Sequence, residues 1–581
     1  MDQFERYFQQ ELIYLRELEK LACEEKPHLN ESLSGQDPDV ARLNEGFAAL
    51  MARLNQKIND GFPELTQPLL QRLQAQSVKG IPATCIVQIE GGKEADFAFS
   101  LPSGTKVQTP IGQPFITTRQ CDVQPLRLVG RAMTHQDQET QLTLTFEYTG
   151  KDDHWDVQPI ELFLSRNGSV ADSLLLGLCR YCYGGELHHN GQTYVMETLR
   201  FVPRSGTDRL VLSPPVAAGN WAPQMLMESF YLPHVHHFLT LDMPYPVKSR
   251  RLPMVDSRTL TLTLKLDTLL SLSDDQLAEA FLLHCVPVVN LQLERLIQPF
   301  KPDTARYPLP LSSHQGLLHI AALTLKGEPN EQGRERGEAG QFYPVSQLTG
   351  MSRNQEEYDN AWFYGLDVSR DALGRLEYAL VFYDSNAKLM KHPPRRQFTC
   401  HFVSFNPQPI ALPIGTDCLT ENLPDRFQIR TITPISASYP PVIDSQRHWR
   451  LMSHYSMSSY VLLSVEAFKQ LLRDYDFYSD SDRPISRQLR RMIEGIQAIK
   501  AEAKDRLVKG LPHRCLYIEL TLDENAYASQ GELFRFADAL YQFLPFFLSN
   551  DMLMLMDVTC QPSGEQWRLS PLPLWGYRPI M

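Results

Sequence analysis

The sequence has no long apolar run, few cysteines and no excess of positive charge. None of its hydrophobic stretches approaches the roughly 18 residues of a membrane-spanning helix, and the N-terminus lacks the charged-then-apolar pattern of a signal peptide. The ten cysteines among 581 residues are scattered and mostly lie in apolar contexts, which favours reduced, buried thiols over a disulfide framework. We therefore expect a cytoplasmic chain that does not itself insert into a membrane.

Positive charge is also scarce, with 56 Lys and Arg against 68 Asp and Glu and a formal net charge of −12. This balance argues against a general nucleic-acid or anionic-membrane binder. Short basic runs occur at 248–251, 391–396 and 487–491, without interleaved aromatic residues. Such runs are typical of a solvated face or of a contact with an acidic partner, and we predict no nucleic-acid partner.

Catalytic motifs are missing as well: there is no G-x-S-x-G, Walker A, G-x-G-x-x-G or H-E-x-x-H. The best metal candidate is CRYC, with Cys179 and Cys182 followed by His188 and His189. Two thiols at this spacing plus imidazoles suit zinc, and a C-x-x-C pair also suits redox cycling. Neighbouring leucines instead indicate that both cysteines lie on a helix in the core, and a single C-x-x-C is a weak signal.

The segment HVHHF raises the same question. On a strand, His234 and His236 would share one face and His237 the other, but no third ligand is placed by the sequence. The paired acids Asp523 and Glu524 follow a predicted strand, where a turn explains them better than acid–base catalysis. We therefore predict no catalytic residue, no metal and no cofactor, so the chain is not expected to be an enzyme. A metal-dependent enzyme remains the less favoured alternative.

Hydrophobic periodicity divides the chain into a helical start and a long sheet-rich remainder. At this length several domains are expected, because single cores stop growing at roughly 250 to 300 residues. Period-two alternation predicts strands with one wet face at 142–146, 160–164, 260–266, 376–382 and 516–522. Three segments, 160–183, 260–291 and 516–555, each run strand, polar turn and amphipathic helix, which suggests repeated sheet-plus-helix modules.

An apolar stripe marks the helical start. Pro38 suits the first position of a helix, behind the N-cap acceptor Asp37. Steps of three and four place one row on a single face: Val40, Leu43, Phe47, Leu50, Leu54 and Ile58. We call this row the apolar stripe. It is typical either of a helical hairpin covering its own domain or of a seam left for another chain.

These patterns predict an α+β fold, in which an N-terminal helical segment is followed by several mixed sheet-plus-helix domains. The predicted ranges are helices at 1–78, a first sheet-rich domain at 79–256, a middle α+β domain at 257–440 and a C-terminal α+β domain at 441–581. The charged, Gly-rich segment 326–340 is predicted to be a mobile loop.

Several segments spread over the chain form a recognisable series. In order they are ELIYLRELEKLA, ARLNEGFAALMARLNQKINDGFPELTQPLL, LPSGTKV, FITTRQCDVQPL, LHCVPVVNLQLERLIQPFKPD, HWRLMSHYSMSSYVLLSVEAFKQLLRDYDF and the stretch 510–556. In these segments the chain resembles, almost from end to end, the TssF family of type VI secretion baseplate subunits, also called VasA or ImpG. Departures at QAQSVKGIPATC and YLPHVHHFLTLDM suggest a divergent branch.

This resemblance implies a structural subunit of the baseplate wedge that scaffolds assembly of the contractile sheath and tube on the cytoplasmic side of the inner membrane. Two copies would join one TssG-like subunit through a shared helical bundle, with the apolar stripe packed partly against another chain. The implied further partners are the TssK adaptor, TssE and the sheath, and the spike hub, with docking at the inner membrane through other components. A phage-type tail baseplate wedge protein is the alternative.

Overall fold

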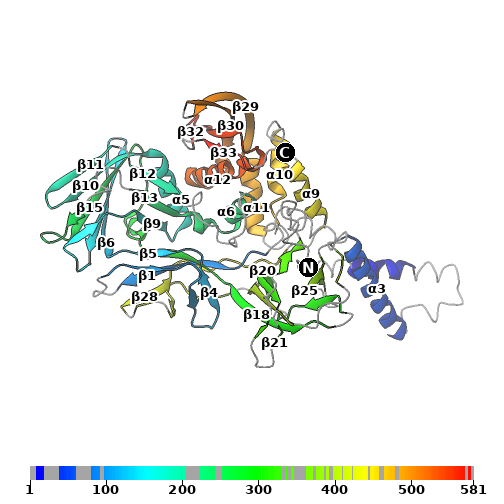
Figure 1. Ribbon diagram of the computed structural model, residues 1–581. Helices are drawn as coiled ribbons and strands as arrows, with labels where there is room; N and C mark the ends of the chain where they lie inside the picture. Colours follow the sequence, from blue (N-terminus) through cyan, green and yellow to red (C-terminus); the bar gives the residue numbers. More distant parts are fainter. Residues whose placement is uncertain are drawn as a thin grey trace.

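The protein consists of several β-sheets with helices at their margins, and the α+β class predicted from the sequence is confirmed (Figure 1). None of the helices in the described ranges combines the length and apolar character that crossing a membrane requires. The computed structural model describes residues 8–18, 38–59, 80–91, 97–197, 199–203, 222–242, 251–301, 304–312, 315–325, 328–329, 335–336, 342–345, 362–370, 375–384, 388–390, 397–408, 410–421, 423–424, 426–441, 445–456, 464–477, 483–508, 510–569 and 573–577.

The helices lie in two main groups, one at the N-terminal edge and one around the C-terminal sheet (Figure 1). Residues 8–18 form a first helix. The labelled α-helices are α3 (Pro38–Asn59), α5 (Gly168–Leu176), α6 (Ala222–Tyr231), α7 (Asp274–Ala278), α9 (Ser445–Ser456), α10 (Val465–Arg473), α11 (Arg483–Glu494) and α12 (Gln530–Phe543). Shorter helical turns are η2 (Gly177–Tyr181), η4 (Pro233–His236), η8 (Glu524–Ala526) and η9 (Leu544–Phe547).

A six-stranded sheet closes into a small β-barrel. Its order is β27 (Asp417–Cys418), β28 (Phe427–Thr431), β1 (Thr84–Gly91), β17 (Cys285–Val289), β4 (Pro114–Thr117) and β3 (Lys106–Gln108). Gln108 and Leu419 exchange two backbone hydrogen bonds of 2.7 and 2.8 Å, which join β3 back to the end of β27 and leave no open edge there. The pair β2 (Phe99–Leu101) and β5 (Cys121–Val123) adds side chains to the same apolar interior.

Two further sheets share one large core with each other. The five-stranded sheet runs β11 (Gln192–Met196), β10 (Cys182–His189), β15 (Thr259–Leu266), β7 (Glu139–Tyr148) and β6 (Leu126–Gln136). The four-stranded sheet runs β12 (Arg200–Pro203), β13 (Phe238–Asp242), β9 (Ile160–Ser165) and β16 (Ala280–Leu282), and β14 (Arg251–Pro253) pairs with β8 (His154–Asp156) nearby. In β7, buried Leu142, Leu144 and Phe146 alternate with less buried threonines, as the period-two pattern predicts.

The middle sheets enclose a separate aromatic core. One sheet is β18 (Gln292–Pro299), β26 (Gln397–Phe405) and β20 (Gly316–Leu325), and the other is β19 (Arg306–Pro308), β25 (Leu376–Tyr383), β24 (Trp362–Arg370) and β23 (Phe342–Pro344). The ring of Phe300 lies 4.9 Å from those of Phe382 and Phe398, centroid to centroid. Within the predicted mobile loop, β21 (Glu328–Pro329) pairs with β22 (Glu335–Arg336), and the rest of 326–340 lies outside the described residues.

The C-terminal sheet is a long ribbon followed by a parallel crossover. Its strands are β29 (Ile496–Val508), β30 (Leu511–Asp523), β31 (Leu553–Gln561), β32 (Gln566–Arg568) and β33 (Leu574–Trp575). β30 and β31 are parallel, and α12 connects them as the segment 516–555 predicts. The segment 160–183 also runs strand, helix, strand, whereas in 260–291 the helix α7 is only 5 residues long because the following apolar residues form β16 and β17.

Helices α5 and α12 pack closely against each other and tie the C-terminal sheet to the five- and four-stranded sheets. A Cβ added at Gly531 would overlap the backbone carbonyl of Asp172, so this crossing requires glycine. The Asp172 carboxylate, buried between the helices, lies 2.8 Å from Arg535 Nε and 2.9 Å from His237 Nε2. One core therefore continues from the five- and four-stranded sheets into α12. The barrel, in turn, takes strands from two of the predicted domain ranges, 79–256 and 257–440. The predicted domain ranges themselves stay a prediction.

Candidate subunit interface

The apolar stripe lies on α3, which begins at Pro38 as predicted. The helix is 22 residues long and is drawn at the edge of the molecule, away from the sheets (Figure 1). Asp39, in the first turn, favours the positive end of the helix dipole and lies 3.6 Å from Arg42. The helix therefore starts where the sequence signals it and extends the stripe along one side.

Four members of the stripe are strongly exposed. The exposed fractions are 73% for Leu43, 51% for Phe47, 71% for Leu50 and 51% for Leu54. Scattered exposed leucines are ordinary, but a row of four large apolar side chains on one helix face is typical of an interaction surface. Val40 and Ile58 belong to the same helix, and their side chains lie outside what the structure describes.

The opposite side of α3 is the buried one. Ala48 and Ala52, four residues apart, are both 0% exposed. At 100° per residue they lie well over a quarter turn from the centre of the apolar stripe. The small side chains of this helix thus face the rest of its own chain while the large apolar ones face outward. This arrangement is the reverse of what a helix contributing its large residues to its own core would show.

The cysteine and histidine candidates are dispersed. The prediction that Cys179 and Cys182 share a helix is wrong for Cys182, because η2 ends at Tyr181 and Cys182 begins β10. Burial raises the pKa of the Cys182 thiol to about 11 and raises that of Cys179 too, which disfavours the thiolate that binds metal. His189 points both ring nitrogens at backbone carbonyls, of Thr259 and Pro253, while His188 Nδ1 lies 2.9 Å from Thr193 Oγ1.

The three histidines of the HVHHF segment precede the strand. The prediction that His234 and His236 lie on the same face of a strand is therefore wrong. Residues Pro233–His236 form the turn η4, since Pro233 begins a 3-10 turn, and β13 starts only at Phe238. His234 Nε2 lies 3.0 Å from Thr84 Oγ1, and His237 is bound by Asp172. Burial lowers the pKa of both His234 and His236 to about 3, so both rings are neutral near pH 7.

The acidic pair after β30 is a turn, as predicted. Asp523 Oδ1 accepts a hydrogen bond of 3.0 Å from the backbone of Asn525 and so caps η8, which contains Glu524.

Among the described ranges, no group of three or more His, Cys, Asp or Glu side chains is placed to hold a metal ion. Asp172, Arg535 and His237 form a buried charge cluster that the sequence did not reveal. It could not be found by spacing because 363 residues separate the ion pair.

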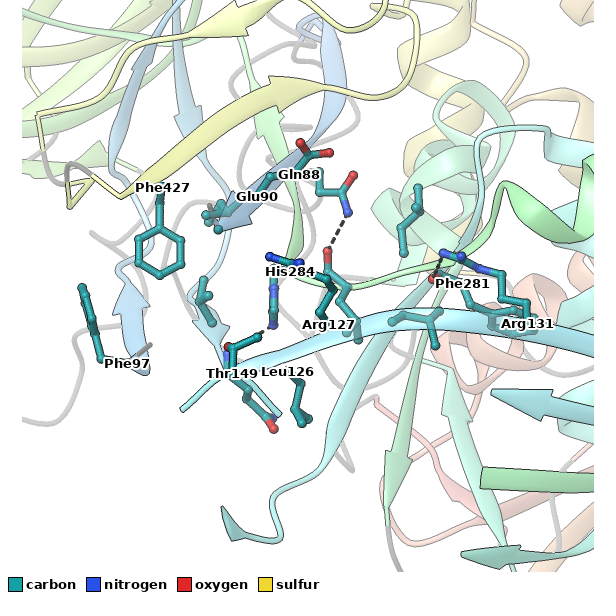
Figure 2. Close-up of a pocket in the computed structure, with 17 residues that line it drawn as sticks. Gln88, Glu90, Phe97, Leu126, Arg127, Arg131, Thr149, Phe281, His284 and Phe427 are labelled. Atoms are coloured by element: carbon teal, nitrogen blue, oxygen red, sulfur yellow. Dashed lines mark hydrogen bonds between the residues drawn. The ribbon is translucent and has the colours of Figure 1, made fainter. Parts of the chain in front are cut away.

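A cavity of ≈260 Å³ lies between β1, β6 and the segment before β17 (Figure 2). Its polar groups hold a tight turn in place. Arg131 donates hydrogen bonds of 2.5 and 3.2 Å to the carbonyls of Ala280 and Phe281, and Gln88 donates to that of Leu283. His284, at φ +54°, accepts from the Gln124 backbone, and burial lowers its pKa to about 4. These contacts are structural, and the groups that line the cavity do not form a nucleophile–base pair.

Together the fold and α3 define a class: a multi-sheet protein whose most conspicuous surface is an exposed apolar helix face, as is typical of subunits of larger assemblies. The sequence matches the family described as "Type VI secretion system, TssF" over residues 1–572, and the chain belongs to this family. The match confirms the function that the sequence resemblance predicts, a structural subunit of the type VI secretion baseplate. It also selects the secretion system over the phage-type alternative.

Individual relatives are more distant. The type VI secretion component TssF1 of Pseudomonas aeruginosa is 34% identical over 116 residues, a stretch covering 18% of this chain and 18% of that protein. A chain of the TssK–TssF–TssG baseplate subcomplex, solved by cryo-electron microscopy, is similar in fold with a TM-score of 0.73 and 22% identity, covering 93% of this chain and 99% of that one. A chain of a type VI baseplate complex has a TM-score of 0.68 and 20% identity over 99% and 100%.

Proposed function

We propose that the chain is a scaffold of the baseplate wedge, and that α3 joins it to a TssG-like subunit and to a second copy of itself. The apolar stripe of Val40, Leu43, Phe47, Leu50, Leu54 and Ile58 is the contact. The observation that carries the proposal is the exposure of its four described large side chains, while Ala48 and Ala52 on the opposite side of the helix are buried. Burying each Leu or Phe in a partner contributes about 1.5–3 kcal/mol, so this row is a strong source of binding energy.

The wider role follows from the family and from the assemblies in which similar folds occur. One neighbour was solved in complex with TssK and TssG, which supports a TssG-like subunit and the TssK adaptor as partners of this chain. TssE, the sheath and the spike hub complete the proposed set. The subunit works on the cytoplasmic side of the inner membrane and docks there through other components. It acts by positioning partners, with no catalytic step of its own.

The test is a set of single charge insertions in α3. Leu43→Glu, Phe47→Glu, Leu50→Glu and Leu54→Glu each place a carboxylate on the stripe, where a partner would have to bury it. Each variant should keep the circular dichroism spectrum of the parent, because the side chain is exposed, and should lose co-purification with a TssG-like subunit. Native mass spectrometry of the parent complex should give a mass of two copies per TssG-like subunit.

Two control variants sharpen this result. Ala41→Glu adds the same charge at an exposed position near the start of α3, on the side away from the stripe, and should bind normally. Ala52→Glu inserts the charge farther along, where this side of the helix is buried, and should unfold or loosen the helix instead. If all four stripe variants bind like the parent, the stripe is not the contact and the partner-facing assignment fails.

A further inference from the structure

Positive charge is concentrated on α9, α10 and α11, although the chain as a whole is acidic. The exposed arginines of α11 are Arg483, Arg487, Arg490 and Arg491. Their spacing places them on one face of the helix, opposite to buried Met492 and the other core residues. Steps of four residues separate successive charges along this face by about 6 Å.

The arginine face ends at a cavity of ≈240 Å³ formed where the three helices meet. Four arginines line it: Arg447 and Arg450 from α9, Arg473 from α10 and Arg490 from α11. Figure 1 shows α9, α10 and α11 next to one another below the C-terminal sheet. The cavity is large enough for an acidic side chain, and guanidinium groups are the donors best suited to a carboxylate.

The acidic groups in the cavity do not use up these donors. Asp474 already interacts with His454 Nε2 at 3.1 Å, and Arg450 approaches it only to 3.4 Å. Arg490 lies 3.9 Å from Asp476, the limit of an ion pair. The side chains of Arg450 and Arg490 remain 51% and 63% exposed. Each guanidinium carries five N–H donors, so both retain donors for a ligand.

The carboxylate of Asp476, like that of Asp474, already has partners within the chain. Tyr231 donates a hydrogen bond of 3.1 Å to it, and Ser486 donates another. Glu494 pairs with Arg473 and Lys469. Along the remainder of the arginine face, no carboxylate of the described ranges lies within ion-pair distance of Arg483, Arg487 or Arg491. The surface thus presents a row of guanidinium groups whose counter-charges are elsewhere.

We propose that α9, α10 and α11 form a docking surface for an acidic segment of a partner protein. One carboxylate of the segment enters the cavity between Arg450 and Arg490, and further carboxylates pair with the row along α11. Trp449, 57% exposed on α9, adds an exposed aromatic side chain to one of these helices, and aromatic residues and arginine are both enriched at protein interfaces. Glu494 and the aspartates in the cavity, with the net charge of −12, disfavour a continuous phosphate backbone.

The experiment uses the full chain and a fluorescent dodecapeptide with glutamate at alternate positions, because residues two apart on an extended chain are spaced by about 6.6 Å, close to the spacing on α11. The peptide should bind at low ionic strength, with affinity falling as salt rises, and a glutamine version should not bind. Arg487→Glu combined with Arg491→Glu should weaken binding at least about tenfold while leaving the circular dichroism spectrum unchanged.

The matched control is Arg258→Glu with Arg514→Glu, which changes net charge equally at exposed sites elsewhere and should shift affinity by no more than about twofold. Leu50→Glu should bind the peptide like the parent, since this surface is independent of α3. The proposal is overturned if the peptide does not bind, or if the control pair weakens it as much. Tighter binding of a thymidine oligonucleotide or of phosphatidylglycerol vesicles to the same arginines would also overturn it.

Discussion

Replacing Asp172 by asparagine should loosen the attachment of α12 to α5. The side chains of Asp172, Arg535 and His237 are each less than 10% exposed, so their charges are held away from water. Burial by itself raises the pKa of Asp172. The opposite effect of Arg535 and His237 together is larger, so the net shift of this pKa is downward. The carboxylate is thus ionised near pH 7 and neutralises Arg535 where solvent cannot.

The magnitude follows from what asparagine leaves behind. It keeps an oxygen acceptor but removes the charge, and an uncompensated buried charge costs about 3–5 kcal/mol. At about 1.4 kcal/mol per tenfold, amides of α5 and α12 should exchange with solvent between about a hundred and several thousand times faster. Hydrogen exchange followed by mass spectrometry measures this locally, which suits a chain too large for a single two-state transition.

A second substitution separates the charge from the packing. Arg535→Met on the Asp172→Asn background removes the unpaired guanidinium and keeps much of its apolar volume, so it should recover a large part of the lost protection. The reasoning is refuted if Asp172→Asn alone changes exchange by less than about tenfold, or if the double variant exchanges faster than the single one.

Three further predictions address packing, thiols and pH. Gly531→Ala should cost about 1–3 kcal/mol in thermal denaturation by overlapping the α5 backbone, whereas Gly46→Ala, with open space around it, should raise helix content in circular dichroism. Cys179→Ser with Cys182→Ser should leave assembly intact with a modest loss of stability, and stoichiometric zinc in purified protein would contradict this. Because His236 is neutral when folded and takes up a proton when unfolded, stability should fall as pH drops from about 6.5 towards 3, and His236→Leu should move the acid-unfolding midpoint to lower pH.

Local pattern was enough to predict the strands and the start of α3. The alternation at 142–146, 260–266 and 516–522 corresponds to β7, β15 and β30, because a sheet with one wet face requires that pattern. Pro38 and the acidic first turn marked the helix start for an equally local reason. The spacing of the apolar stripe likewise predicted which side of α3 carries its large residues.

Features that depend on distant pairing were beyond such patterns. The closure of the barrel rests on Gln108 meeting Leu419, and nothing around either residue signals the other. The ion pair of Asp172 and Arg535 is hidden for the same reason. At His234 to His237 the deciding signal is local, since Pro233 favours a turn over a strand.

The long separation of the barrel strands has a consequence for the nascent chain. β1 pairs with β28, which begins at Phe427, long after β1 ends at Gly91. At synthesis rates of about 5–20 residues per second, the ribosome needs roughly 20–70 s to supply that partner. During this interval the inward-facing Val87 and Ile89 have only part of their final surroundings. We therefore expect this barrel to close long after its first strand is synthesised, and that strand to be a place where chaperones bind the growing polypeptide.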